Sequence, residues 1–219
     1  MSCYSMYLIP RRTQYLHSRY KSLHANRTCK MSMLRSCKYF LPIQTRWSDN
    51  DQYGHVNNTV YYQMMDTIIN NYLIWYCGLT TDSTRSSEIG FMVKTNFQYI
   101  RALKYPETVL GGLRVTKIGR SSVTYQFHIF QTKENNEKHD VLDPFAPIGF
   151  KGQILSGEDS DLVSPYLSLE ENFLSTSSAV GEAIHVFVDP RSQKPKQLSP
   201  GLRNGLEKLV LSADSRSNL

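Results

Sequence analysis

The sequence predicts an α+β domain in which an antiparallel sheet of about five strands wraps around one long helix. Three observations support this. Apolar residues recur at three- and four-residue steps through one segment of about 20 residues, and at every second position in several shorter runs. The helical segment follows the first strand, and three more strands follow it directly. A helix that is apolar on several sides needs a broad surface to cover it, and the sheet supplies one.

The long helix is predicted from about Val56 to Gly78, because glycine commonly lies just past a helix C-terminus. Its apolar positions with helical spacing are Val60, Tyr61, Met64, Ile68, Tyr72 and Trp75. Polar residues occupy positions between them, namely Gln63, Asp66, Asn70 and Asn71. This is the pattern of an amphipathic helix.

Strands are predicted where apolar residues alternate or where Val, Leu and Ile are dense. The segments are residues 39–47, 89–100, 107–119, 121–132 and 177–189. Pro42 favours an edge position for the first strand, Gly111 and Gly112 suggest a bulge, and the turn at 117–122 predicts a hairpin. A short helix is expected over 199–211, with Ser199 as its cap and Pro200 in its first turn.

Residues 133–175 interrupt this pattern, because they are polar, contain Pro144, Pro147 and Pro165, and lack sustained periodicity. We predict a long surface insertion there. It lies within a domain of residues 39–210, which a tail of residues 211–219 follows.

The N-terminal segment differs from the rest of the chain in charge. The first 48 residues hold nine of the 25 Lys and Arg residues and no acid, so the remainder carries 16 basic residues against all 19 acids. A mildly acidic body argues against nucleic acid as a partner. An Arg- and Ser-rich segment without acids is typical of a mitochondrial transit peptide, so we predict a disordered presequence over residues 1–38 and a location in the matrix. The alternative is a basic tail that binds RNA or anionic lipid.

Two further classes of structure are disfavoured by composition. No stretch approaches the roughly 18 apolar residues of a membrane span, so we expect no stable membrane insertion. The four cysteines, Cys3, Cys29, Cys37 and Cys77, show neither paired nor metal-binding spacing, so we expect no disulfide and no metal site. No organic cofactor is expected either.

Residues 46–62, RWSDNDQYGHVNNTVYY, place small polar groups directly before the apolar helix. This stretch resembles the start of the central helix in hotdog-fold thioesterases of the 4-hydroxybenzoyl-CoA thioesterase-like group. The matching positions, in order, are Trp47, Asp49, Asp51, Gly54, His55, Val56, Asn57, Asn58, Tyr61 and Asp66. The resemblance covers residues 40–132 and 176–208, so it implies a hotdog fold and leaves out the presequence and the insertion.

The resemblance implies a thioester-hydrolysing site at this helix end. Asp51 matches the family's catalytic carboxylate, a nucleophile or a general base, although it could instead form an Asx-turn. A helix N-terminus offers unpaired backbone N–H groups to the oxyanion of an attacked thioester carbonyl, so we expect those near Val56, Asn57 and Asn58 to serve. Gly54 would let the backbone approach the substrate closely.

The remaining motif residues have alternative roles. His55 could polarise the carbonyl or orient water, and it could equally be structural. Asn58 could contact substrate or cap the helix. Asp49 is expected to fix the loop through backbone hydrogen bonds. Asp66 stands where relatives carry a glutamate, and it could bond within the helix or approach a partner subunit's site.

Binding residues for coenzyme A follow from charge and from the family. Candidates for the phosphates are Arg101, Lys104, Arg120, Ser121 and Ser122, and each could also be an ordinary solvated side chain. Met64, Met65, Ile68 and Phe91 could line the acyl pocket or belong to the core. Family members pair through the sheet, so a homodimer or a homotetramer is expected.

The sequence therefore predicts a hydrolase of acyl-CoA or acyl-carrier-protein thioesters. An alternative of another class is a non-catalytic hotdog protein that binds acyl chains or a protein partner, which the 133–175 insertion would serve. A hotdog dehydratase is a weaker possibility, because the usual form of its His and acid pair is lacking. A calcium loop beginning at Asp49 is excluded, since Tyr53 and Val60 would fall at ligand positions. There is also no Gly-x-Ser-x-Gly motif of an α/β-hydrolase.

Overall fold

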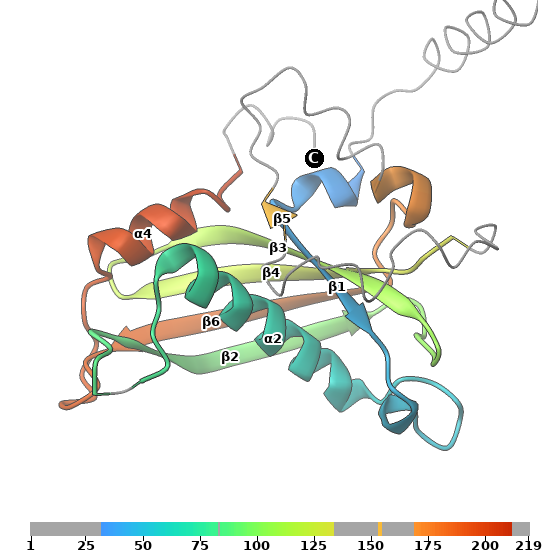
Figure 1. The fold of residues 1–219 in the computed structure, drawn as a ribbon, viewed down its shortest axis with the longest axis horizontal. Helices are drawn as coiled ribbons and strands as arrows, with labels where there is room; N and C mark the ends of the chain where they lie inside the picture. Colours follow the sequence, from blue (N-terminus) through green and yellow to red (C-terminus); the bar gives the residue numbers. More distant parts are fainter. Residues whose placement is uncertain (1–31, 83, 134–152, 155–168, 212–219) are drawn as a thin grey trace, which may run out of the picture.

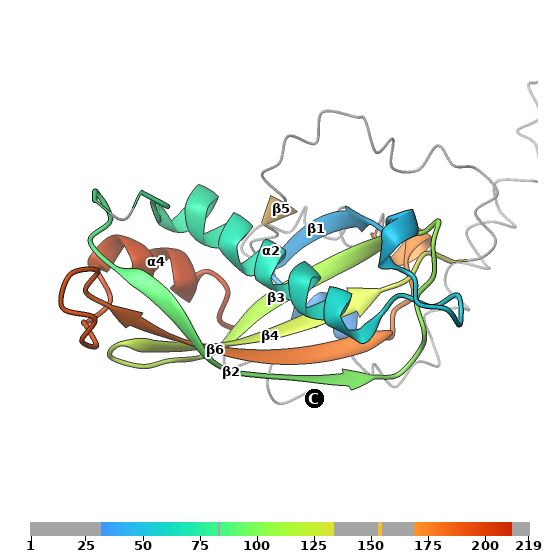
Figure 2. The same cartoon turned by 90° about the horizontal axis from the view of Figure 1, so that it is seen from below.

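A six-stranded antiparallel sheet and a long helix across one of its faces dominate the part of the chain that the structure describes (Figures 1 and 2). This computed structural model describes residues 32–82, 84–133, 153–154 and 169–211. The strand order is β2-β6-β4-β3-β1-β5. The elements are η1 (Met33–Ser36), β1 (Tyr39–Gln44), η2 (Trp47–Asp49), α2 (Asn58–Cys77), β2 (Ile89–Tyr99), β3 (Thr108–Ile118), β4 (Ser122–Phe130), β5 (Gln153–Ile154), β6 (Ala179–Val188) and α4 (Pro200–Glu207).

The predicted α+β class and the hotdog arrangement are confirmed. Eight residues of α2 are buried against the sheet, including Met64, Met65 and Ile68, which therefore belong to the core. Trp75 departs from the predicted apolar face, because 49% of its side chain is exposed. No helix among the described residues is long and apolar enough to cross a membrane.

The ends of α2 are fixed by local chemistry. Gly78 follows the last turn with φ of 69°, a left-handed conformation that glycine adopts readily, as predicted. At the other end, the Oδ1 atom of Asn57 accepts a hydrogen bond from the backbone N–H of Thr59. The cap is therefore Asn57, and the alternative prediction that Asn58 caps the helix is wrong.

Two predicted details of the sheet are corrected. Gly111 and Gly112 pair regularly with β4, and the bulges lie between Met92 and Lys94 and between Val115 and Lys117. Gly112 instead leaves room for the side chain of Cys37, since a Cβ on Gly112 would lie 2.8 Å from the Sγ atom of Cys37. A sixth strand, β5, pairs with β1 at Tyr39 and Phe40 from inside the predicted insertion.

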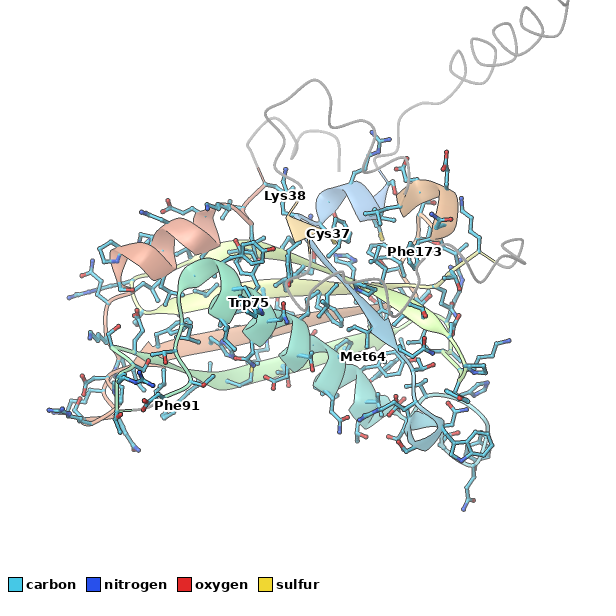
Figure 3. All side chains as sticks on the ribbon, viewed as in Figure 1. Cys37, Lys38, Met64, Trp75, Phe91 and Phe173 are labelled. Carbon is cyan, nitrogen blue, oxygen red and sulfur yellow. The ribbon has the colours of Figure 1, made fainter. Side chains whose placement is uncertain are left out.

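A second hydrophobic cluster lies on the sheet face opposite α2, because Tyr39 of β1 packs under the helix and its neighbour Phe40 packs on the other side. The cluster joins Leu34 and Cys37, from just before β1, to Phe173, and all three side chains are at most 1% exposed. Figure 3 shows Cys37 and Phe173 with the segments that carry them.

This second cluster moves two predicted boundaries. The domain begins before residue 38, since Leu34 and Cys37 belong to its core, and the insertion ends before residue 169, where a helical turn leads to Phe173. Leu211, assigned to the tail, is also buried. Residues 1–31, 134–152, 155–168 and 212–219 lie outside the described residues. The proposed presequence and most of the insertion and tail fall among them.

Candidate functional site

The loop before α2 is built around the carboxylate of Asp51. Its Oδ1 atom accepts hydrogen bonds from the backbone N–H groups of Tyr53 (2.8 Å) and His55 (3.2 Å). These contacts form the Asx-turn that the sequence left open as an alternative. No hydrogen bond within the described residues reaches Oδ2, so one oxygen shapes the loop while the other is left for a ligand. Gly54 completes the turn with φ of 77°, which explains the glycine.

Asp49 anchors the start of the same loop. It is 3% exposed, and its carboxylate accepts hydrogen bonds from the backbone N–H (2.7 Å) and the Nε atom (2.9 Å) of Arg46. The predicted loop-fixing role of Asp49 is confirmed.

Most of the backbone N–H groups near the start of α2 already donate hydrogen bonds within the protein. Val56 N–H donates to the carbonyl of Leu103, and Asn57 N–H donates to the carbonyl of Asp49, both at 2.8 Å. Gly54 N–H donates to the carbonyl of Asp51. Among the residues predicted to supply oxyanion donors, only Asn58 has an N–H group without a hydrogen-bond partner in the described part of the chain. The predicted donors at Val56 and Asn57 are therefore wrong.

These groups border an open pocket of about 240 Å³ between the start of α2 and the end of β2. The loop and α2 contribute five of its lining residues, and the end of β2 with the residues after it contributes four. They are Asp51, His55, Val56, Asn58, Tyr61, Tyr99, Ile100, Arg101 and Ala102. The proposed catalytic residues Asp51, His55 and Asn58 are thus brought together.

The pocket includes residues that sequence reasoning missed. Tyr61 and Tyr99 form its aromatic wall, with ring centroids 4.9 Å apart, and the Tyr61 hydroxyl accepts a hydrogen bond from Leu103 N–H. Burial raises the pKa of Tyr61, so its phenol stays protonated at neutral pH. Tyr61 belongs to the motif and could have been found there. Tyr99 carried no signal beyond its place in a strand.

The candidate residues for binding coenzyme A lie in two separate parts of the molecule. Arg101 lines the pocket and donates to the Oγ1 atom of Thr176, and exposed Lys104 follows in the same loop. Arg120, Ser121 and Ser122 lie at the β3–β4 turn, beside α4 at the opposite end of the sheet (Figure 1). Phe91 also lies far from the pocket, near the start of β2 (Figure 3).

The chemistry of the site follows from its parts. Asp51 and Asn58 line one pocket at the N-terminus of a 20-residue helix, where the helix dipole is positive. This combination suits attack on a carbonyl whose oxygen becomes negative. Within the described residues, no group of three or more His, Cys, Asp or Glu side chains is arranged to hold a metal ion.

Comparison with known proteins identifies the family to which the chain belongs. Residues 53–138 match the family model described as the thioesterase superfamily. The PA5185 protein from Pseudomonas aeruginosa is 31% identical, with 82% of this chain and 96% of that chain covered and a TM-score of 0.59. The chain belongs to the hotdog-fold thioesterase superfamily.

Two other solved structures, both of thioesterases, support the fold alone, because their sequence identities to this chain are low. DHNA-CoA thioesterase from Staphylococcus aureus is 17% identical over 77% of this chain and 88% of that chain, with a TM-score of 0.51. Slr0204, a 1,4-dihydroxy-2-naphthoyl-CoA thioesterase from Synechocystis, is 13% identical over 78% of this chain and 98% of that chain, with a TM-score of 0.52. No curated protein sequence matches the chain significantly.

Proposed function

We propose that this thioesterase-superfamily protein hydrolyses acyl-CoA to a free carboxylic acid and coenzyme A. The observation that supports the proposal most is that Asp51 and Asn58 line one pocket at the N-terminus of α2. Thioesterase activity in general follows from the family, and the acyl-CoA substrate and the residue roles are our proposal.

In the proposed reaction, the thioester carbonyl oxygen accepts a hydrogen bond from Asn58 N–H, which the helix dipole strengthens. Oδ2 of Asp51 removes a proton from water as the water oxygen bonds to the carbonyl carbon. The carbon–sulfur bond then breaks, and the departing thiolate takes up the proton. Alternatively, Oδ2 itself attacks and water hydrolyses the resulting anhydride. His55 and the Asn58 side chain, both exposed at the pocket, would orient water or substrate.

The proposed assembly is a homodimer that pairs edge to edge through β2. This strand is 11 residues long and among the described strands it pairs with β6 alone, so its other edge is open to strand addition. Arg101 and Lys104 would bind CoA phosphates beside their own pocket. Arg120, Ser121 and Ser122 could contact the nucleotide only from a partner subunit. The proposed location is the mitochondrial matrix, because the Arg- and Ser-rich N-terminal segment without acids is typical of a transit peptide.

The decisive experiment is a comparison of wild-type protein with Asp51→Asn on a panel of acyl-CoA and acyl-carrier-protein thioesters. Asparagine keeps a carbonyl oxygen that can accept hydrogen bonds from the Tyr53 and His55 N–H groups, so the loop should keep its conformation. We expect kcat to fall by at least about 100-fold, the lower range for loss of an acid–base group. Asp82→Asn, in a loop at the other end of α2, is the matched control and should behave as wild type.

The competing function is an acyl-binding hotdog protein without catalysis. It is favoured by the engagement of Asp51 Oδ1 in the Asx-turn, which would explain the aspartate without chemistry. Equal turnover by wild-type and Asp51→Asn protein, or no turnover of any thioester, would replace our proposal with this one.

A further inference from the structure

The residues just before β6 support one wall of the pocket. Ile100, Arg101 and Ala102 line the pocket directly after the end of β2. The backbone N–H groups of Ile100 and Arg101 both donate to the carbonyl of Ser178, at 2.8 and 2.9 Å. Ser178 immediately precedes β6 and is completely buried. The position of this wall therefore depends on a residue that is distant from it in the sequence.

Ser178 is in turn fixed to the end of β4 and the residue that follows it. Its N–H group donates to the carbonyl of Ile129 (2.7 Å), and its Oγ atom donates to the Oε1 atom of Gln131 (2.7 Å). The Nε2 atom of Gln131 donates to the carbonyl of Ala102 (3.1 Å). The backbone of the wall is therefore held independently of the side chain of Arg101.

A single side-chain contact orients Arg101 itself. The Nη1 atom of Arg101 donates to the Oγ1 atom of Thr176 at 3.0 Å. Both residues are exposed, and Arg101 forms no ion pair within the part of the chain that the structure describes. Thr176 therefore holds one nitrogen of the guanidinium beside the pocket and leaves the other nitrogens for a ligand.

The guanidinium of Arg101 is suited to a phosphate. It presents five N–H donors in one plane, and two of them can meet two oxygens of the same phosphate. An exposed arginine side chain loses conformational entropy when a ligand fixes it, and a hydrogen bond that restricts it beforehand reduces that loss. Phosphates are carried by the coenzyme A part of the proposed substrate.

We propose that Thr176 is a positioning residue for substrate binding: its hydroxyl orients the guanidinium of Arg101 at the pocket, and the remaining N–H groups of Arg101 bind a phosphate of the acyl-CoA. This inference rests on the proposed thioesterase function and deepens it. Thr176 lies outside residues 53–138, which match the family model, so it extends the binding machinery to a segment beyond that match.

The substitution Thr176→Val tests this role, because valine keeps the shape of threonine and removes the hydroxyl. We expect KM for an acyl-CoA to rise about 2- to 10-fold, the scale of one hydrogen bond, while kcat stays within about twofold of wild type. KM for the corresponding acyl-pantetheine, which carries no phosphate, should not change. An equal rise on both substrates would show a general effect on the pocket and would overturn the proposal.

A third substrate identifies the phosphate that Arg101 contacts. Acyl-phosphopantetheine carries only the phosphate that coenzyme A shares with the prosthetic group of acyl-carrier protein. If Thr176→Val raises its KM, Arg101 binds this shared phosphate. If only the acyl-CoA value rises, Arg101 binds the phosphates farther along coenzyme A. No rise on either phosphate-bearing substrate would overturn the proposal.

A double substitution tests whether Thr176 acts through Arg101. Arg101→Met keeps most of the aliphatic chain and removes the guanidinium, so we expect KM for acyl-CoA to rise about 10- to 100-fold. Adding Thr176→Val to Arg101→Met should raise KM no further, because the group that Thr176 orients is gone. The same rise from Thr176→Val in both backgrounds would show that Thr176 acts by another route, against the proposal.

Two variants control for changes in the fold. Thr176→Ser keeps the hydroxyl and should restore the wild-type KM for acyl-CoA, and a rise as large as that in Thr176→Val would contradict the proposal. Thr116→Val makes the same exchange at another exposed threonine, on β3 near the β3–β4 turn at the opposite end of the sheet. It should leave all three KM values unchanged.

Failure of the two proposals can be told apart. If wild-type protein hydrolyses no thioester, the proposed function fails, and calorimetric titration with coenzyme A then tests Thr176 by itself. Thr176→Val should raise the Kd for coenzyme A about 2- to 10-fold, and an unchanged Kd or absent binding would refute its role. If wild-type protein hydrolyses thioesters and Thr176→Val matches it on every substrate, only the role of Thr176 fails.

Discussion

At the scale of single residues, Asp51 holds the loop with one carboxylate oxygen and would supply the other to the proposed reaction. Oδ1 holds the loop through Tyr53 and His55, which orients the carboxylate before any substrate binds. Such preorganisation reduces the entropy lost when reacting groups are aligned. Truncating Asp51 would therefore damage the loop as well as remove the reactive oxygen, and Asp51→Asn separates the two effects.

The proposed oxyanion donor can be deleted without deleting the helix. Asn58 is the first residue of α2, where proline is tolerated, and Asn57 before it has the extended conformation that proline requires (φ −59°, ψ 142°). Asn58→Pro removes the N–H group, so we expect kcat to fall by about 100- to 1,000-fold. Steady-state kinetics and circular dichroism would measure activity and helix content together.

Asn58→Ala provides the control for this prediction, because it removes the side chain and keeps the N–H group. We expect its kcat to stay much closer to wild type. Similar losses in the proline and alanine variants would assign the role to the side-chain amide instead.

The motif alone could predict Asp51, Asn58 and the place of the pocket, because the spacing of these residues sets the loop and the helix start. It could not predict which N–H groups remain unpaired. That allocation depends on the carbonyls of Leu103, distant in sequence, and Asp49, and only the folded chain brings Leu103 to Val56. The contribution of Tyr99 to the pocket depends on the same tertiary placement.

At the scale of elements, short segments around β1 complete the sheet. η1 precedes β1, and β5 and the turn at residue 169 come from the predicted insertion. None has enough residues for a recognisable period, because two or four residues cannot display alternation or a helical repeat. The long elements were predictable, and these short ones were not, since tertiary contacts rather than local pattern decide them.

Removal of the residues before β1 should therefore destabilise the domain. A chain starting at residue 32 keeps the second cluster, whereas one starting at residue 39 loses Leu34 and Cys37 from it. We expect the shorter chain to lose at least about 2–5 kcal/mol of unfolding free energy, the range for one large core truncation. Urea unfolding of both chains measures the difference.

The point variant Leu34→Ala in the full chain should reproduce much of this loss. Met33→Ala, at a neighbouring position that is 44% exposed, should have a small effect. Equal stability of the two truncated chains would show that the second cluster contributes little to the free energy of unfolding. The predicted domain boundary after residue 38 would then stand.

At the scale of the whole molecule, each face of the sheet buries one histidine among the residues that the structure describes. His185 lies under α2, and His128 lies on the opposite face, hydrogen-bonded to Ser177 and stacked on Phe130. Burial lowers the pKa of each to about 4, below its ordinary value of 6.5. The unfolded chain therefore binds more protons than the folded one between these values.

Stability should consequently fall as pH drops from about 6.5 toward 4, and should be insensitive to these groups above 6.5. Each imidazole can contribute up to about 1.4 kcal/mol per pH unit within that window. Urea unfolding at pH 7, 6 and 5 measures the slope, and His128→Gln should reduce it. If the variant unfolds with the wild-type pH dependence, burial does not hold His128 neutral.

The two edges of the sheet are not equally open to the addition of further strands. β5 shields the start of β1, and the rest of that strand carries Pro42, which has no N–H to donate. β2, at the other margin, is long and uncovered by any described strand. A sheet with one open edge can add a single partner strand and cannot extend further. Association through β2 would therefore end at a dimer, which protects the protein from fibrous aggregation.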